Sequence, residues 1–307
     1  MRAVTIIAVV AVAGAIALGL FSAQRVSIPR EVAPSMEVNQ LFEDWMVQHQ
    51  KSYASPEEKN YRRSVFAQTL ANIAEYNKMY SHGSAVNKFS DLTFEEFLAQ
   101  STGYRISPEK AALKATMKPS SQQDFLTQTP SLDWRTKGIV NPVKDQGKCG
   151  SCWAFSATSS IESAWAQAGN PLVQLSEQQM VDCSRSYGNL GCNGGYEDRA
   201  FLYIKTVGGQ ELSSDYPYTA SNGKCSFDKS KIKASIVGYQ VLPQQDCAGL
   251  MTSATQQPVS VGVAVTQPFQ SYSSGVFSIT NCGLDINHAV NVEGYGTDST
   301  TNQNFWL

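Results

Sequence analysis

The sequence lacks several features that would point to particular classes of protein. Its 307 residues contain no cluster of Lys and Arg, and the formal net charge is −2, so a nucleic-acid partner is not expected. No Asn-x-Ser/Thr acceptor occurs, which excludes targeting through an N-linked glycan. Histidine is rare, with 3 residues, and no cysteine precedes Cys149. Any chemistry based on these side chains therefore depends on very few candidates.

The residues that are present are typical of a folded, exported protein. Hydrophobic residues make up 42% of the chain and charged residues 16%, as in globular domains. An apolar run from Val4 to Phe21 predicts a secretory signal peptide over residues 1–23. An uncleaved membrane anchor is the alternative, and only then do we expect contact with a membrane. Both alternatives place the protein in the secretory pathway, destined for a lysosome or acidic vacuole or for the extracellular space.

Cysteine divides the chain into two regions. The cysteine-free region begins with helical patterns: Ser55 and Thr93 each start a capping motif before an apolar periodicity. Glu58 and Arg62 form an i,i+4 pair on the first of these helices. From Ser107 to Pro130 the periodicity is lost and Pro, Ser and Gln accumulate, which predicts an exposed linker. Beyond it we expect a helical half and then a β half, with a strand over 259–265 and a short strand ending in a glycine turn over 287–296.

The most informative stretch is Gln146–Ser156, in which two cysteines flank Gly150-Ser151 just before a small-residue helix over 154–169. Cys152 lies at the expected helix N-terminus, where the helix dipole favours a thiolate. His288, 136 residues later, is the only histidine beyond the linker and is the candidate base. A redox or zinc CxxC is disfavoured because no βαβ pattern or second CxxC occurs, so no metal or cofactor is expected. His49 and His82 are expected to be packing or surface residues, and Asp285 a solvated acid.

These motifs together resemble papain-like cysteine proteases, specifically the cathepsin L-like group. The resemblance covers nearly all of the chain past the leader and rests on the segments 133–135, 146–156, 175–178, 191–195 and 287–289. It implies an α+β fold with two subdomains, a helical half and a β-barrel-like half, preceded by an α-helical inhibitory propeptide. The implied boundaries are 24–127 for the propeptide and 128–307 for the peptidase domain.

The resemblance also implies roles for individual residues. Cys152 would be the nucleophile, His288 the general base and Gln146 a donor to the oxyanion. Gly194 and Gly195 would pair with the substrate backbone. A roomy apolar pocket for Phe or Leu, at the second residue before the cut bond, would involve Tyr196, Gly262, Ile286 and Ala289. The implied disulfides are Cys149–Cys192 and Cys183–Cys225. Cys282 either pairs with Cys247 or is left without its family partner, and we expect the second.

The chain departs from the family pattern at several positions. Thr69 and Ala85 stand where the propeptide motifs have Asn and Gly. The family continues a Phe-Trp-Leu strand into Lys-Asn-Ser-Trp-Gly, whose Asn orients the histidine, whereas this sequence stops at Leu307. Asn304 precedes that strand and does not fit the role. We therefore expect a peptidase domain truncated at its C-terminus. The alternative to an active enzyme is an impaired or inactive relative that acts as an inhibitor.

The expected product is a monomeric zymogen of a cysteine endopeptidase. Its partners would be protein or peptide substrates and its own propeptide, held as an intramolecular inhibitor. We expect activation by a cut between Thr127 and Gln128. Protonation of carboxylates such as Glu58, Asp91 and Glu96 would loosen propeptide docking at low pH.

Overall fold

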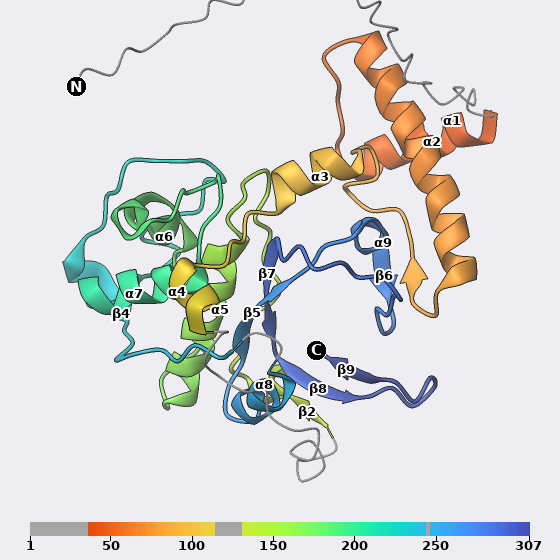
Figure 1. The fold of residues 1–307 in the computed structure, drawn as a ribbon. Helices are drawn as coiled ribbons and strands as arrows, with labels where there is room; N and C mark the ends of the chain where they lie inside the picture. Colours follow the sequence, from red (N-terminus) through yellow and green to blue (C-terminus); the bar gives the residue numbers. More distant parts are fainter. Residues whose placement is uncertain (1–35, 114–130, 244–245) are drawn as a thin grey trace, which may run out of the picture. The chain divides into compact units, whose positions relative to one another are not determined.

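The computed structural model describes residues 36–113, 131–243 and 246–307 (Figure 1). The expected signal peptide and the expected cut at Thr127 lie outside these residues. All of the described elements belong to one compact unit. Within the described ranges, no helix combines the length and the apolar character that crossing a membrane requires.

The described part of the chain mixes helices with short strands. The helices are α1 (Met36–Gln48), α2 (Pro56–Met79), α3 (Phe94–Ser101), α4 (Pro108–Leu113), α5 (Cys152–Gln167), α6 (Glu177–Cys183), α7 (Glu197–Val207), α8 (Cys247–Ala254) and α9 (Gln267–Gln270). The strands are β1 (Gly83–Ser84), β2 (Leu132–Asp133), β3 (Gln210–Glu211), β4 (Ile232–Ala234), β5 (Val259–Val263), β6 (Tyr272–Ser274), β7 (His288–Val292), β8 (Gly294–Thr297) and β9 (Asn304–Trp306).

The N-terminal segment, residues 36–113, has a small aromatic core of its own. Phe42, Trp45 and Phe66 pack with ring centroids 5.1–5.8 Å apart, and all three are buried. Both predicted caps are confirmed. Ser55 accepts the Glu58 N–H at the start of α2, and Thr93 forms a complete capping box with Glu96 at the start of α3. These local bonds fix where the helices begin.

The predicted linker is wrong over its first residues. Pro108–Leu113 forms α4, and Ser107 is fully buried rather than exposed. The Ser107 hydroxyl accepts the N–H of Lys110, which makes Ser107 a helix cap followed by a proline in the first turn. The packing of α4 against the helical half stabilises a helix that its six residues alone would not sustain. Residues 114–130 of the linker lie outside the described ranges.

The helical half is built around α5, which Figure 1 shows in green beside α6 and α7. Its first turn contributes Trp153 and Ala154, both fully buried, to the main hydrophobic core. A buried ion pair holds the preceding loop to α5, since the Lys144 ammonium lies 2.6 Å from Glu162 and 2.6 Å from Glu177. The sequence pattern of small residues permits close packing of α5 against its neighbours.

The β half consists of small antiparallel sheets. β5 pairs with β7 so that Val263 faces His288 and Gly262 faces Ala289, and β8 lies between β2 and β9. The glycine turn expected at the end of the 287–296 stretch is instead a second strand, β8, because the chain changes partners at Glu293. There the Glu293 N–H donates to the carbonyl of Leu307 at 2.7 Å.

The N-terminal segment contacts both halves. On the β half, β1 pairs with β6, and the Asn87 amide donates to the carbonyl of Gln270 at 2.7 Å. On the helical half, the α4 region places Ser107 on Asp198 and Lys110 on Glu197. Between these two attachments the chain crosses the face where α5 and β7 meet.

Candidate active site

A rigid loop presents the start of α5. Gly147 adopts a positive φ of 61°, which a side chain would strain, and its N–H donates to the Asp145 carboxylate. The Tyr218 hydroxyl lies 2.7 Å from the carbonyl oxygen of Gln146. The Cys149–Cys192 disulfide fastens the loop to its neighbour, and the N–H of Gly150 adds a bond to the Cys192 carbonyl. The residue that follows, Cys152, therefore has a fixed position.

The Cys152 thiol is buried, with 1% of the residue exposed. Burial raises the pKa of Cys152 to about 11, although backbone N–H groups, first that of Ala289, act in the opposite direction. The expected thiolate at the helix N-terminus is therefore not the state of this form of the protein. The physical reason is that the N-terminal segment excludes water from the sulfur, and desolvation outweighs the helix dipole.

His288 opens β7, the strand that packs on α5. The Ser156 hydroxyl of α5 donates to the Val290 carbonyl of β7 at 2.7 Å, which ties the two elements together beside the thiol. The sulfur of Cys152 interacts with the N–H of Ala289, the neighbour of His288. Burial lowers the pKa of His288 to about 4, and a bond with the Ser101 backbone only partly offsets it. With these pKa values, Cys152 and His288 are both neutral near pH 7.

A carbonyl of the N-terminal segment occupies the centre of the site. The side-chain amide of Gln146 donates to the backbone oxygen of Ser101 at 3.0 Å and to that of Cys149 at 2.9 Å. The Ser101 backbone also raises the pKa of His288, so this residue of the N-terminal segment acts on both side chains. The amide of Gln146 is aimed at a carbonyl oxygen next to the thiol, as a donor to an oxyanion must be.

The chain then runs along Gly195 as an added strand. Gly195 donates to the Gly103 carbonyl at 2.8 Å and accepts the Arg105 N–H at 3.0 Å, which forms a parallel bridge with Tyr104. A Cβ on Gly195 would lie 2.6 Å from the Trp153 ring, so only glycine fits at this position. The neighbouring Gly194 closely faces the Gly103 carbonyl as well. Both glycines therefore line the path of an extended peptide.

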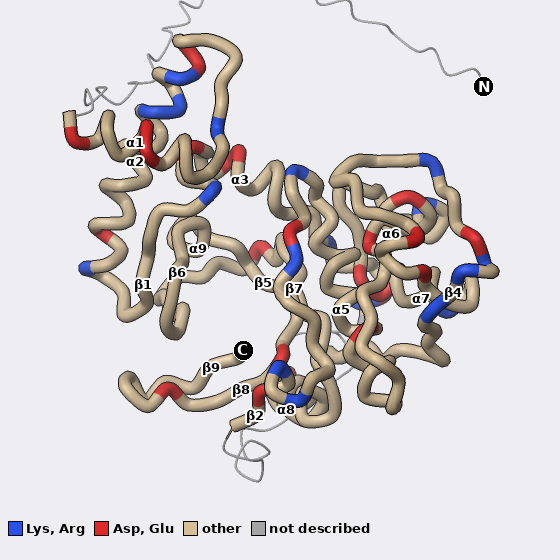
Figure 2. The backbone as a smooth tube through the Cα atoms, turned by 180° about the vertical axis from the view of Figure 1, so that it is seen from behind, with Lys and Arg blue, Asp and Glu red and all other residues tan. Residues whose placement is uncertain are grey.

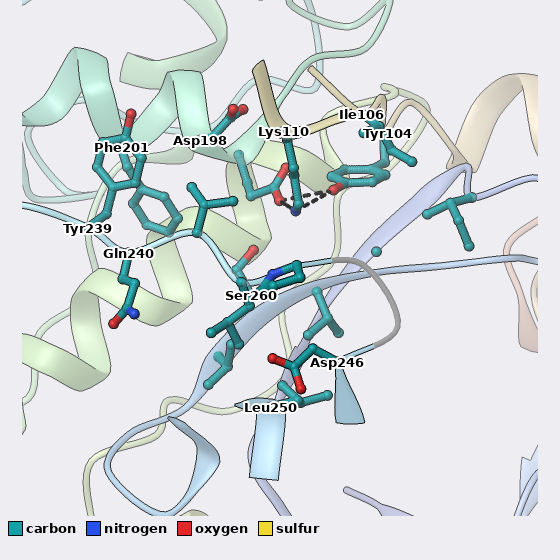
Figure 3. Close-up of a pocket in the computed structure, with 18 of the residues that line it drawn as sticks. Tyr104, Ile106, Lys110, Asp198, Phe201, Tyr239, Gln240, Asp246, Leu250 and Ser260 are labelled. Carbon is teal, nitrogen blue, oxygen red and sulfur yellow. Dashed lines mark hydrogen bonds and ion pairs between the residues drawn. The ribbon is translucent and has the colours of Figure 1, made fainter. Parts of the chain in front are cut away.

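Beside this path lies a cavity of about 410 Å³ (Figure 3). Gly262 and Ile286 line it as expected, and the Tyr104 ring fills the space that the missing side chain of Gly262 leaves. Tyr196 and Ala289 are not among its lining residues. Ala289 is buried in the core, and the Tyr196 ring lies 4.6 Å from the Arg199 guanidinium.

The sequence prediction missed the charged residues that line this cavity, which are Lys110, Glu197, Asp198 and Asp246. Glu197, 4% exposed, accepts a hydrogen bond from the Tyr104 hydroxyl at 2.9 Å. The sequence carried one signal for the position of Glu197. It lies two residues after Gly195, so its side chain is close to the pocket beside that glycine. The cavity is consequently not purely apolar.

The remaining cysteines and histidines lie away from this centre. Cys183 pairs with Cys225, so both disulfides are the pairings that the resemblance implies. Across the described ranges, Cys247 and Cys282 are exposed free thiols and do not pair with each other. The same ranges contain no group of three His, Cys, Asp or Glu side chains arranged to hold a metal. The His49 ring packs at a tilt against Trp45, and His82 is buried against Phe277.

Comparisons with known proteins agree with this arrangement. Residues 128–307 match the papain family cysteine protease, and residues 42–97 match the cathepsin propeptide inhibitor domain. Digestive cysteine proteinase 1 of Homarus americanus is 41% identical over 278 residues, covering 88% of this chain and 84% of that protein. Procathepsin L of Rattus norvegicus is 39% identical over 279 residues, covering 88% and 81%.

Solved structures give the same result. A digestive procathepsin L 3 from Tenebrio molitor larval midgut superimposes with a TM-score of 0.77 at 37% identity, covering 89% of this chain and 88% of that one. A recombinant stem bromelain precursor gives 0.78 at 35% identity, covering 88% and 86%. The chain is therefore a cysteine protease made with an inhibitory propeptide. It belongs to the papain family and has that family's two-subdomain fold, and no finding favours the inactive alternative.

Proposed function

We propose that Cys152 is the nucleophile and His288 the proton carrier of peptide-bond hydrolysis. His288 takes the thiol proton, and the sulfur attacks the substrate carbonyl carbon to give a tetrahedral oxyanion. The side-chain amide of Gln146 and the N–H of Cys152 stabilise that oxyanion. His288 then protonates the leaving amine, which departs and leaves a thioester. Water, deprotonated by His288, hydrolyses the thioester and restores the thiol.

One observation carries this assignment. The side-chain amide of Gln146 donates to the Ser101 carbonyl at 3.0 Å, and the backbone of the same residue raises the pKa of His288. A carbonyl held by this amide stands where we propose that the carbonyl of a substrate is attacked. Because the next residues pair with Gly195, the propeptide also covers the path that we assign to the substrate backbone. Access to the nucleophile requires that this segment leave.

The proposed mature enzyme begins near residue 128, after loss of the signal peptide over 1–23 and the propeptide over 24–127. We place the protein in the secretory pathway, in a lysosome or acidic vacuole or outside the cell, as a monomer. The two disulfides support an oxidising compartment. An acidic compartment would also supply the trigger for activation.

The test uses the full chain incubated at acid pH and assayed with a fluorogenic peptide. The wild type should gain activity, and N-terminal sequencing of the product should start at Gln128. Cys152→Ala and His288→Ala should each lose nearly all turnover, whereas Cys282→Ser, which changes an exposed thiol, should keep it. Equal activity in wild type and Cys152→Ala would exclude this thiol as the nucleophile. A first residue far from Gln128 would reject the proposed boundary.

A further inference from the structure

The cavity beside Gly195 contains a carboxylate that an apolar pocket would not need. Most of its lining is apolar, including Ile106, Phe201 and Ile286. Glu197 also lines the cavity, and only 5% of its side chain is exposed. Its Oε2 atom is buried and has no hydrogen-bond partner among the described residues. A buried carboxylate oxygen without a donor is costly, so its retention indicates a ligand.

The donors that Glu197 does have both belong to the propeptide. Tyr104 donates its hydroxyl to Oε1 at 2.9 Å, and the Lys110 ammonium binds the same oxygen (Figure 3). Lys110 also donates to the Tyr104 hydroxyl at 2.9 Å. When the propeptide leaves, both donors leave with it. Among the described residues of the mature enzyme, no side chain donates a hydrogen bond to this carboxylate.

Tyr104 shows how a substrate side chain would enter this pocket. Its backbone forms a β-bridge with Gly195, the residue proposed to pair with substrate. Its ring packs directly against Gly262, since a Cβ added to that glycine would lie 2.5 Å from the ring. The residue is buried, with 5% exposed. The pocket therefore accommodates a whole tyrosine, with the hydroxyl placed at the carboxylate.

We propose that Glu197 is a specificity residue that selects a hydrogen-bond donor, and tyrosine in particular, at the second substrate residue before the cut bond. The proposal rests on the proposed function of the site and replaces the expected preference for Phe or Leu. A phenylalanine would fill the same volume but leave the carboxylate without a donor. A site built to bond a hydroxyl discriminates against the analogue that lacks it.

The test compares two peptides that differ only in Tyr or Phe at this position, cut by the acid-activated full-length protein. We expect kcat/KM to favour Tyr about tenfold, since a hydrogen bond to a charged group has that order of effect. Glu197→Met should bring the ratio to about one. Glu197→Gln, which keeps an acceptor oxygen, should retain part of the preference. A wild-type ratio at or below one, or the same ratio in Glu197→Met, would overturn the proposal.

Asp198→Asn is the matched control for charge. Asp198 lines the same cavity, and changing it to Asn removes one negative charge, as Glu197→Gln does. Its carboxylate contacts Ser107 and the N–H of Arg199 rather than Tyr104. The Tyr to Phe ratio should stay near the wild-type value in this variant. An equal fall in Asp198→Asn and Glu197→Gln would mean that general charge, not a directed bond, sets the preference, and would overturn the proposal.

A second measurement does not need activity, so it separates this proposal from the proposed function. In the full-length zymogen carrying Cys152→Ala, the thermal midpoint is measured for Tyr104→Phe, Glu197→Met and the double variant. If Glu197 recognises a phenol hydroxyl, the double variant should lose clearly less than the sum of the single losses. Additive losses would overturn the recognition even if the enzyme is active. Non-additive losses would support it even if no peptide is cut.

Discussion

The side-chain amide of Gln146 donates to the backbone carbonyl of Ser101 at 3.0 Å, across 45 residues of sequence. The donor proposed for the oxyanion is therefore already engaged by the propeptide. A peptide group of the propeptide thus occupies the position that we propose for the substrate carbonyl.

The thiol should be far less reactive in the zymogen than after activation. Burial raises the pKa of Cys152 to about 11, so its thiolate fraction at pH 7 is roughly 300-fold below that of an ordinary thiol. Iodoacetamide should label Cys152 at least about 100-fold more slowly before activation than after it. The measurement is mass spectrometry of the labelled peptide.

The two exposed thiols must be removed to make this readout clean. A Cys247→Ser, Cys282→Ser background leaves Cys152 as the one free thiol among the described residues. Equal labelling rates before and after acid treatment would show that the propeptide does not control the thiol.

Gly103→Ala should weaken inhibition. A Cβ at Gly103 would lie 2.2 Å from the Gly150 carbonyl oxygen, so the propeptide strand must move out of the cleft. Overpacking of this kind costs about 1–3 kcal/mol, enough to raise basal hydrolysis at neutral pH about tenfold. Gly238→Ala is the control, because a Cβ there meets nothing within 4 Å. Identical basal rates in the two variants would contradict the prediction.

Glu96→Gln should let the zymogen activate at a higher pH. Burial alone would raise the pKa of Glu96, but its bond with Arg62 lowers it overall. Its contribution to the propeptide fold is therefore present above about pH 4.5, the ordinary value, and is lost as pH falls through the lowered pKa. The variant lacks that contribution at every pH. The pH of half-processing in a fixed time measures the effect.

The exposed neighbour Glu95 supplies the matched control for that experiment, because Glu95→Gln removes a charge from the same helix turn without touching Arg62. It should leave the half-processing pH unchanged. A shift as large as that of Glu96→Gln would mean that charge near the α3 terminus, not the Arg62 bond, stabilises the propeptide.

His82→Phe should lower the pH at which the propeptide is released. His82 is buried between Tyr80 and Phe277, and burial lowers its pKa from the ordinary 6.5. His82 binds a proton more readily in the released propeptide than in the docked one. Docking therefore weakens as the pH falls below about 6.5. Phenylalanine keeps the ring contacts and cannot be protonated. Processing followed against pH should therefore shift to more acidic values.

His49→Phe is the comparison for that variant, because His49 packs against Trp45 inside the propeptide. It should not move the pH profile. If both variants shift alike, or if His82→Phe does not shift, His82 is not a proton sensor of docking.

Local signals in the sequence predicted local structure well. The caps at Ser55 and Thr93 are decided within four residues, and both helices begin there. The break between β7 and β8 was missed because it depends on Leu307, which reaches Glu293 only in the folded chain. Helix α4 was missed because proline and lost periodicity hid a six-residue helix that depends on tertiary packing.

The candidate site was predicted in its chemistry but not in its state. Cys152, His288 and Gln146 were predicted from spacing and resemblance, and the Ser101 backbone interacts with two of them, Gln146 and His288. The sequence could not show which side chains the carboxylates of the propeptide bind. Asp91, expected to hold the propeptide on the enzyme, instead binds Lys51 and Tyr53 within the propeptide, and Glu96 binds Arg62 there. Figure 2 shows acidic and basic residues following one another along these N-terminal helices.

The pairs that Asp91 and Glu96 form thus stabilise the propeptide itself, while its attachment to the enzyme is multivalent. One anchor is at Asn87 and Gln270 on the β half, another is at Lys110 and Glu197 on the helical half, and the strand along Gly195 is a third. While the other anchors hold, a detached segment stays at high effective concentration and rebinds faster than a free peptide could. A single broken anchor should therefore be repaired, and activation should need all of them to open within one rebinding time. The zymogen should therefore activate steeply once the anchors open together, and very little before that point.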